Sequence, residues 1–237
     1  EMIALINDLI DKNHAYEKDG HVLFHVPSYE NYGSLSKRNR EEQIAGSRVE
    51  IAPFKKDPAD FVLWKPSNDK QPGWDSPWGY GRPGWHTECS AMSEKTLGLP
   101  FDIHGGGRDL TFPHHENEIA QSCCSSADIN NPNSYVNYWM HNGFVTVNGE
   151  KMSKSLGNIS LVKDLTDSNH GEVVRLALLS SHYRQALDWN EKVIHQSKRL
   201  LDKLYNLLNE IKEVEPSKDL SLSDSFISPL LDDLNTP

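Results

Sequence analysis

One stretch of the 237-residue sequence, Trp85–Glu118, concentrates side chains that bind metals. It reads W-H-T-E-C at Trp85–Cys89, D-I-H-G-G-G-R-D-L at Asp102–Leu110 and F-P-H-H-E-N-E at Phe112–Glu118. A thiol, four histidines and several carboxylates therefore lie close together in the sequence. Zinc takes Cys, His and Glu side chains in a tetrahedral shell, so this stretch predicts a zinc site.

Three of these side chains form the predicted metal shell. Pro113 suits the first turn of a helix, and His114 and Glu118, four residues apart, then share one helical face. Cys89 supplies a sulfur from an earlier segment, and His115 is the alternative histidine because it precedes Glu118 by three residues. Three protein ligands leave an open coordination position, which is typical of a working site. A fourth ligand from outside this chain would instead close the shell.

A structural interpretation competes with the metal site. It treats cysteines as small buried hydrophobic residues and histidines as local caps. Cys123 and Cys124 fit that description, because adjacent cysteines cannot easily share one tetrahedral ion, and we predict that both are structural. The clustering of Cys89 with four histidines favours a metal instead.

Composition limits the class of protein. The net charge of −10 excludes a chain that is basic throughout, so any RNA contact requires a local basic patch. No apolar run approaches the ~18 residues that span a bilayer. Three cysteines do not make a disulfide framework and fit a reducing compartment. We expect a cytoplasmic protein without a membrane segment.

The alternation of apolar and polar residues predicts a mixed α/β chain. The stretch 74–85, rich in Gly, Pro and Trp, predicts an ordered loop without a regular element. Glycines 105–107 predict a turn where a ligand approaches the backbone, and Asn148-Gly149 predicts a hairpin turn. The predicted helices cover 1–13, 90–98, 113–122, 172–180 and 192–214, and the predicted strands cover 21–26, 58–64, 101–104, 135–139 and 144–147.

Three long segments together resemble the cysteinyl-tRNA synthetases, a family of class I aminoacyl-tRNA synthetases. They are G-W-H-T-E-C-S-A-M at 84–92, F-D-I-H-G-G-G-R-D-L-T-F-P-H-H-E-N-E-I-A-Q-S at 101–122 and G-E-K-M-S-K-S-L-G-N at 149–158. The similarity extends over essentially the whole chain. It implies an α/β fold: the C-terminal half of a Rossmann-type catalytic domain with its connective insertion, followed by helices of a helical-bundle domain.

The resemblance also implies a division of the chain. Residues 1–57 would be a connective insertion segment, and 58–163 the second half of the catalytic domain with the zinc site and the K-M-S-K-S loop. Residues 164–237 would be a linking segment and the start of a helical tRNA-binding domain. The family's H-x-G-H signature and a further zinc cysteine are expected upstream, and the 237 residues do not contain that signature. We therefore expect a fragment that is inactive alone.

Roles near the metal follow from the resemblance. Trp85 would close the small substrate pocket beside the zinc, and His104 would bind substrate and act near the reacting groups. Gly107 and Asp109 would contact the adenosine ribose. A helix N-cap is the structural alternative for Asp109.

Roles at the nucleotide phosphates follow from the signature loop that begins at Lys151. Lys154 would act at the α-phosphate with the assistance of Lys151, and the backbone of Val145 would contact adenine. An isolated basic loop of this kind would otherwise be a solvated surface feature.

The implied function is a ligase that attaches L-cysteine to tRNA(Cys) through a cysteinyl-adenylate formed from ATP with Mg²⁺. Zinc would select the substrate thiolate, because the hydroxyl of serine is a poor ligand for such a site. We expect a monomer. Two alternatives stay open: a zinc-dependent ligase of the same fold that joins cysteine to an amino-sugar–inositol, and a non-catalytic module that binds zinc or nucleic acid.

Overall fold

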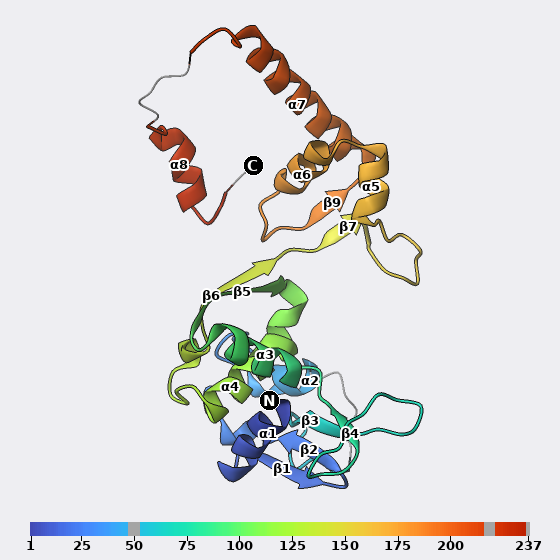
Figure 1. The fold of residues 1–237 in the computed structure, drawn as a ribbon, viewed down its shortest axis with the longest axis vertical. Coiled ribbons are helices and arrows are strands. Elements are labelled where there is room, and N and C mark those ends of the chain that lie inside the picture. Colours follow the sequence, from blue (N-terminus) through green and yellow to red (C-terminus); the bar gives the residue numbers. More distant parts are fainter. Residues whose placement is uncertain (47–52, 216–220, 236–237) are drawn as a thin grey trace. The chain divides into compact units, whose positions relative to one another are not determined.

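The computed structural model describes residues 1–46, 53–215 and 221–235 and divides into two compact units, 1–140 and 141–237. In Figure 1 the first unit runs from blue to yellow-green and the second from yellow to red. This division differs from the three predicted segments 1–57, 58–163 and 164–237, which stay a prediction.

The first unit begins with the predicted helix and continues into an antiparallel sheet. The helix α1 (Met2–Asp11) buries an apolar stripe that includes Ile6 and Leu9, as its spacing predicts. The sheet has the strand order β1-β2-β3-β4. Its strands are bounded by Ala15–Lys18, His21–Phe24, Phe61–Pro66 and Gly81–Pro83.

Two predictions about this sheet need correction. The strand predicted at 58–64 begins only at Phe61, because Asp60 turns its carboxylate back to accept from the backbone N–H groups of Asp57 and Val26. The stretch 74–85 is not free of regular structure, since β4 lies within it. Gly81 makes this pairing possible: a Cβ there would lie 2.5 Å from the carbonyl oxygen of Lys65.

Two helices of the first unit carry the predicted metal ligands. The helix α3 (Thr87–Leu97) begins three residues earlier than predicted, so Cys89 lies in its first turn. The helix α4 (Glu116–Ser125) is buried along its whole length and packs against α1 and α3. An irregular helical turn, Thr111–His115, precedes α4, and the extended backbone of Phe112 interrupts it. A shorter helix, α2, covers Arg40–Gly46.

The strand β5 (Phe101–Gly107) pairs with β6 (Val136–Asn142). The prediction of a glycine turn at 105–107 is wrong, because the strand continues through all three glycines. Gly106 instead allows close packing, since a Cβ at that position would lie 2.8 Å from Cε1 of His115. The glycines thus bring this strand against the histidine-bearing turn.

The second unit combines a small sheet with helices. In it β7 (Val145–Val147) pairs antiparallel with β8 (Glu150–Lys151) and parallel with β9 (Leu187–Trp189). The predicted hairpin turn is confirmed, with positive φ values of 52° and 81° at Asn148 and Gly149.

The helices of the second unit are α5, α6, α7 and α8, with bounds Val162–Ser168, Gly171–Leu179, Glu191–Glu210 and Asp224–Leu231. The small core of this unit joins α6 to β9 through Ala177 and Trp189. The predicted helix 192–214 ends earlier, at Glu210. Across the described ranges, none of the helices combines the length and apolarity needed to cross a membrane.

Candidate metal centre

The structure brings the three predicted metal ligands together. The ligand atoms of Cys89, His114 and Glu118 lie within 4.8 Å of one another. His114 Nε2 lies 2.8 Å from Glu118 Oε1, as the spacing of four residues on one helical face predicts. The extended backbone at Phe112 ends the preceding turn and sets the direction from which His114 enters the site.

The chemistry of this group fits zinc. Glu118 is fully buried, and its Oε1 atom has no hydrogen-bond partner although His114 Nε2 is close. A buried carboxylate oxygen without a partner is costly, and a cation between the sulfur, the imidazole and this oxygen would remove that cost. Sulfur, nitrogen and oxygen donors in one small shell are the set that zinc takes in proteins.

The second oxygen of Glu118 is held by other partners. The hydroxyl of Tyr135 donates to Glu118 Oε2 over 2.7 Å, and His104 Nε2 lies 3.3 Å from the same atom. Burial lowers the pKa of His104, although the Glu118 carboxylate partly opposes that effect. Glu118 therefore has one oxygen directed to the metal group and one fixed by its surroundings.

Both adjacent histidines reach Glu118, but in different groups. The ligand atoms of His104, His115 and Glu118 also lie within 4.8 Å of one another. Only His114 belongs to the group that contains the thiol of Cys89. The structure thus favours His114 over His115 as the partner of Cys89.

A further histidine contacts this group. His86 Nδ1 lies 2.7 Å from His114 Nδ1, and both rings are buried. Burial lowers the pKa of His86 to about 3, and the neighbouring His114 contributes to the same shift. For His114, burial favours the neutral ring, but the adjacent Cys89 and Glu118 outweigh burial and raise the pKa to about 9.

Trp85 lies beside this cluster. Its ring centroid is 4.5 Å from that of His114 and 5.1 Å from that of His86. The indole is nevertheless 60% exposed, so one face meets the histidines and the rest is accessible to a ligand. This placement agrees with the predicted closing role, which stays a prediction.

The predicted ribose contacts lie near the end of β5. Asp109 is exposed on a short 3-10 turn, and a Cβ at Gly107 would lie 2.6 Å from Asp109 Oδ1. A cavity of about 470 Å³ opens here. It is lined by Leu35, Ser36, Arg38, Arg108, Asp109, Thr111 and Phe112.

The predicted phosphate-binding lysines lie in the second unit. Lys151 is on β8 and Lys154 is in the turn that follows, and both side chains are exposed. Lys151 Nζ lies 5.4 Å from the ring centroid of Phe144. The loop is held by a hydrogen bond from the backbone N–H of Ser153 to Asn158 Oδ1, at 2.8 Å.

The family of the chain follows from comparison with known proteins. The family model described as tRNA synthetases class I (C) catalytic domain matches residues 1–199. The chain belongs to this class I tRNA synthetase catalytic-domain family. The match confirms the predicted family and α/β fold class.

Curated relatives of this class I synthetase chain are named cysteine--tRNA ligase. Those from Parvibaculum lavamentivorans and Rhodospirillum rubrum are each 58% identical to it and match the whole chain. The chain spans about half the length of these relatives, because the match covers 50% of each.

A solved structure supports the fold of the class I synthetase chain. Methionyl-tRNA synthetase from Mycobacterium tuberculosis in complex with methionyl-adenylate has a TM-score of 0.62 at 16% identity. The match covers 98% of this chain and 57% of that one. At this identity the likeness shows the fold alone.

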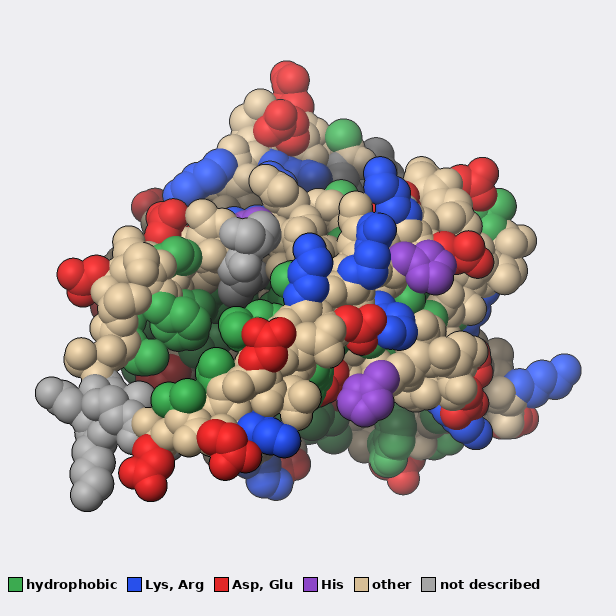
Figure 2. All heavy atoms as spheres, turned by 90° about the horizontal axis from the view of Figure 1, so that it is seen from above, with side chains coloured by type: hydrophobic (Ala, Val, Ile, Leu, Met, Phe, Trp, Pro, Cys, Tyr) green, Lys and Arg blue, Asp and Glu red, His purple; other side chains and the backbone are tan. Residues whose placement is uncertain are grey.

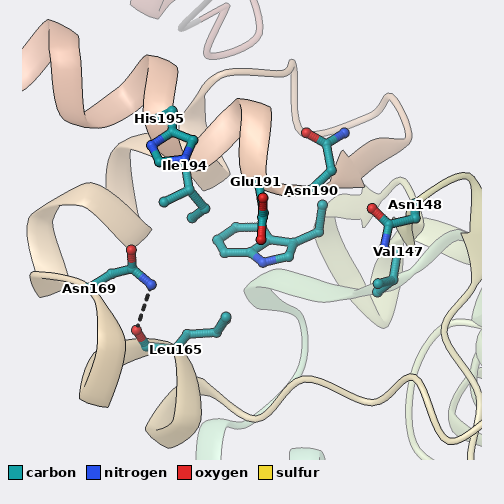
Figure 3. Close-up of a pocket in the computed structure, with 9 residues that line it drawn as sticks. Val147, Asn148, Leu165, Asn169, Asn190, Glu191, Ile194 and His195 are labelled. Atoms are coloured by element: carbon teal, nitrogen blue, oxygen red, sulfur yellow. Dashed lines mark hydrogen bonds between the residues drawn. The ribbon is translucent and has the colours of Figure 1, made fainter.

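One hollow of the class I synthetase chain is not lined by the residues that we predict to bind the nucleotide. This hollow has a volume of about 360 Å³ and lies in the second unit. Figure 3 shows its lining residues, which include three asparagines. The side chain of Asn169 donates to the carbonyl of Leu165 over 3.1 Å. Neither Val145 nor the two signature lysines line this hollow.

The distribution of charged side chains on the surface bears on RNA binding. Figure 2 shows basic and acidic side chains interspersed on one face of the molecule. A shallow groove along α7 has the same mixed character: its lining comprises Glu191, Lys192, His195, Lys198, Arg199 and Asp202. Lys198 is already paired with Asp202 at 2.6 Å. This groove of the synthetase chain is therefore no uniformly basic patch.

Sequence reasoning missed the contacts of two buried residues that lie near the candidate metal ligands of the synthetase chain. Glu116 is fully buried, and its carboxylate accepts from the backbone N–H groups of Gly33 at 2.9 Å and Ser36 at 2.8 Å. His86 contacts His114 through a ring nitrogen, and Glu116 holds the loop that contains Gly33 and Ser36. His86 and Glu116 both lie inside the quoted motifs, but their partners are 28 to 83 residues away in the sequence. A local sequence pattern cannot predict contacts over such separations.

Proposed function

We propose that this chain is part of a ligase that attaches L-cysteine to tRNA(Cys) through a cysteinyl-adenylate formed from ATP with Mg²⁺. The observation that carries the proposal is the convergence of a thiol, an imidazole and a carboxylate within 4.8 Å beside Trp85. The name cysteine--tRNA ligase of relatives that match the whole chain supports it. A cytoplasmic monomer remains part of the proposal.

The proposed zinc ligands are Cys89 Sγ, His114 Nε2 and Glu118 Oε1. When bound there, zinc supplies an open coordination position for which a thiolate is a much better ligand than a hydroxyl. This difference can exceed the ~1–3 kcal/mol that pocket shape gives for a small change in the substrate. Selection of cysteine over serine then needs no separate editing step.

The proposed roles in substrate binding are assigned within each unit separately. Trp85 packs against His114 and would close the substrate pocket there, and His104 has a ring nitrogen 3.3 Å from Glu118 Oε2. Asp109 accepts hydrogen bonds from ribose hydroxyls, and Lys154 with Lys151 supplies positive charge to the phosphates. The protein positions the reactants and stabilises charge rather than forming a covalent bond with them.

The reaction would proceed in two steps. A carboxylate oxygen of cysteine forms a bond to the α-phosphorus of ATP while the bond to the bridging β-phosphate oxygen breaks, and pyrophosphate leaves. A ribose hydroxyl at the 3′ end of tRNA then attacks the carbonyl carbon, the bond to AMP breaks, and the hydroxyl proton is released. Lys154 acts in the first step by balancing the negative charge of the phosphates.

The test is the change Cys89→Ser in a protein of the relatives' length. We expect it to lose zinc and to raise the KM for cysteine in ATP–pyrophosphate exchange, with the KM for ATP unchanged. Cys123→Ser is the matched control, because this buried thiol lies outside both ligand groups. Unchanged zinc content in Cys89→Ser would contradict the proposal. Transfer of the cysteinyl group to the amine of an amino-sugar–inositol, with release of AMP, instead of to tRNA would favour the alternative ligase. Binding of tRNA without exchange would favour the non-catalytic module.

A further inference from the structure

Two buried histidine rings face one another through the same type of nitrogen. The Nδ1 atoms of His86 and His114 are 2.7 Å apart, and the two residues are 7% and 6% exposed. A hydrogen bond between two ring nitrogens requires a proton on one of them and a lone pair on the other. A histidine that binds a metal is neutral, and with both rings neutral this pair has two possible arrangements.

Only one arrangement is compatible with a metal ligand. If His114 carries the Nδ1 proton, its neutral ring presents a lone pair at Nε2, the atom that lies 2.8 Å from Glu118 Oε1. If His86 carries the shared proton, a neutral His114 must be protonated at Nε2, and that nitrogen cannot bind a metal. The hydrogen-bond partner of His114 Nδ1 therefore decides whether His114 Nε2 can bind the metal.

The surroundings hold His86 in its place. Its ring meets the ring of Phe61 edge to face at 5.8 Å and that of Trp85 at 5.1 Å. Its residue also forms the N-cap of α3, and its carbonyl accepts from the backbone N–H of Ser90. Since Cys89 lies in the first turn of α3, the same helix end carries the thiol and the partner of the imidazole.

We propose that His86 is a positioning residue of the metal centre: it accepts the Nδ1 proton of His114 and thereby presents His114 Nε2 as a lone pair to zinc. The inference rests on the proposed zinc site and deepens it. His86 itself does not touch the metal. Its function is to select the metal-binding form of its neighbour.

The neutrality of His86 has a second consequence. Many metal-bound histidines donate to a carboxylate, which adds negative charge to the site. Here the thiolate of Cys89 and the carboxylate of Glu118 would already balance the two positive charges of zinc, the expected upstream cysteine would add a further negative charge, and a neutral His86 would add none. A neutral partner therefore leaves the centre more receptive to a further anionic ligand, such as a thiolate.

The first experiment replaces the acceptor in a protein of the relatives' length, which would include the expected upstream zinc cysteine, and measures Co²⁺ and Zn²⁺ affinity by titration. We expect His86→Leu to weaken binding by about 10–100-fold, the range for lost supporting contacts of metal ligands. His86→Asn should stay within about threefold of the parent, because its side-chain oxygen can take the place of Nδ1 as acceptor. His195→Leu on the exposed face of α7 is the control for loss of any histidine.

The second experiment changes the charge of the acceptor. His86→Asp should bind Co²⁺ at least as tightly as His86→Asn, but should bind L-cysteine more weakly, seen as a smaller gain of sulfur-to-cobalt charge-transfer absorption. His86→Asp and His86→Asn have side chains of equal size and differ mainly in charge. Their comparison therefore remains a valid test if His86→Leu does not fold.

The outcomes separate two failures. Equal metal affinity in the parent and His86→Leu, with a folded variant, would overturn the positioning role alone. Equal cysteine binding by His86→Asp and His86→Asn would overturn the charge argument. Absence of Co²⁺ binding in the parent protein of the relatives' length would overturn the proposed zinc site, and this inference with it.

Discussion

The metal centre of the first unit and the lysine loop of the second unit are built in opposite ways. His114 and Glu118 are buried, and Glu118 is in contact with Tyr135, His104 and His114. Lys151 and Lys154 are exposed. One region fixes its reactive atoms through surrounding side chains, whereas the other presents charge to solvent.

The contacts that hold the two regions also differ in range. Glu116, beside the proposed metal ligands, accepts hydrogen bonds from backbone groups 83 and 80 residues away, at Gly33 and Ser36. The lysine loop is held by Asn158, which bonds the backbone of Ser153 and Lys151 five and seven residues away. Segments held only by local, exposed contacts open easily.

The difference matches the two kinds of recognition that we propose. Discrimination between a thiol and a hydroxyl would depend on donor atoms held within a fraction of an ångström, which requires buried and supported donors. Neutralisation of a polyphosphate would depend mainly on positive charge, which acts over several ångströms and tolerates movement. Changes in the two regions should therefore have separable effects.

The largest effect, on the rate of adenylate formation, is expected at Lys154 and tests the contrast between the lysine loop and the candidate metal centre. Lys154→Ala should slow adenylate formation by about 100-fold, the scale for loss of one group that stabilises developing charge. Because the side chain is exposed, zinc content and the free energy of unfolding should not change. ATP–pyrophosphate exchange in a protein of the relatives' length measures the rate, and Lys163→Ala on the exposed face of α5 is the control. Loss of zinc in Lys154→Ala would break the contrast.

A smaller effect, on stability, is expected at Glu116. Glu116→Gln should lower the free energy of unfolding of the first unit by about 2 kcal/mol, because an amide donor would face a backbone N–H group in a buried site. Denaturant titration of the 237-residue chain measures it. Glu88→Gln, at an exposed position of α3, should change stability by less than about 0.5 kcal/mol. Equal effects of the two substitutions would show that the buried carboxylate does not hold the loop.

The smallest effect is expected at Asn158. Asn158→Ala removes the two hydrogen bonds that the Asn158 side chain makes within the lysine loop and should cost less than about 1 kcal/mol. Hydrogen exchange of the loop amides should become faster, while exchange in α4 and metal affinity should stay unchanged. Asn206→Ala on α7 is the control. A lower metal affinity or faster hydrogen exchange in α4 would show that the two regions are not independent.

Local patterns predicted much of this molecule. The apolar spacing of Met2–Asp11 predicted α1, and Asn148-Gly149 predicted its hairpin, because periodicity and positive φ are properties of a few neighbouring residues. The spacing of His114 and Glu118 likewise placed both side chains on one face. Each of these depends on contacts within one or two turns of chain.

The errors lie where distant segments intervene. Glycines 105–107 suggested a turn, but pairing with β6 and close approach of His115 draw them into a strand. Gly81 suggested a loop, but its missing side chain lets β4 lie against β3. In both places glycine serves close packing rather than a turn, and packing partners are invisible in a local pattern.

By itself the sequence determined which atoms are available for metal binding: one thiol, adjacent histidines and a carboxylate one helical turn further on. The tertiary structure decided which of them meet. It grouped His114 rather than His115 with Cys89, gave His114 a buried histidine partner at Nδ1, and fixed Glu118 through Tyr135. The physical reason is that ligand identity follows from side-chain chemistry, whereas ligand geometry follows from packing between segments far apart in the chain.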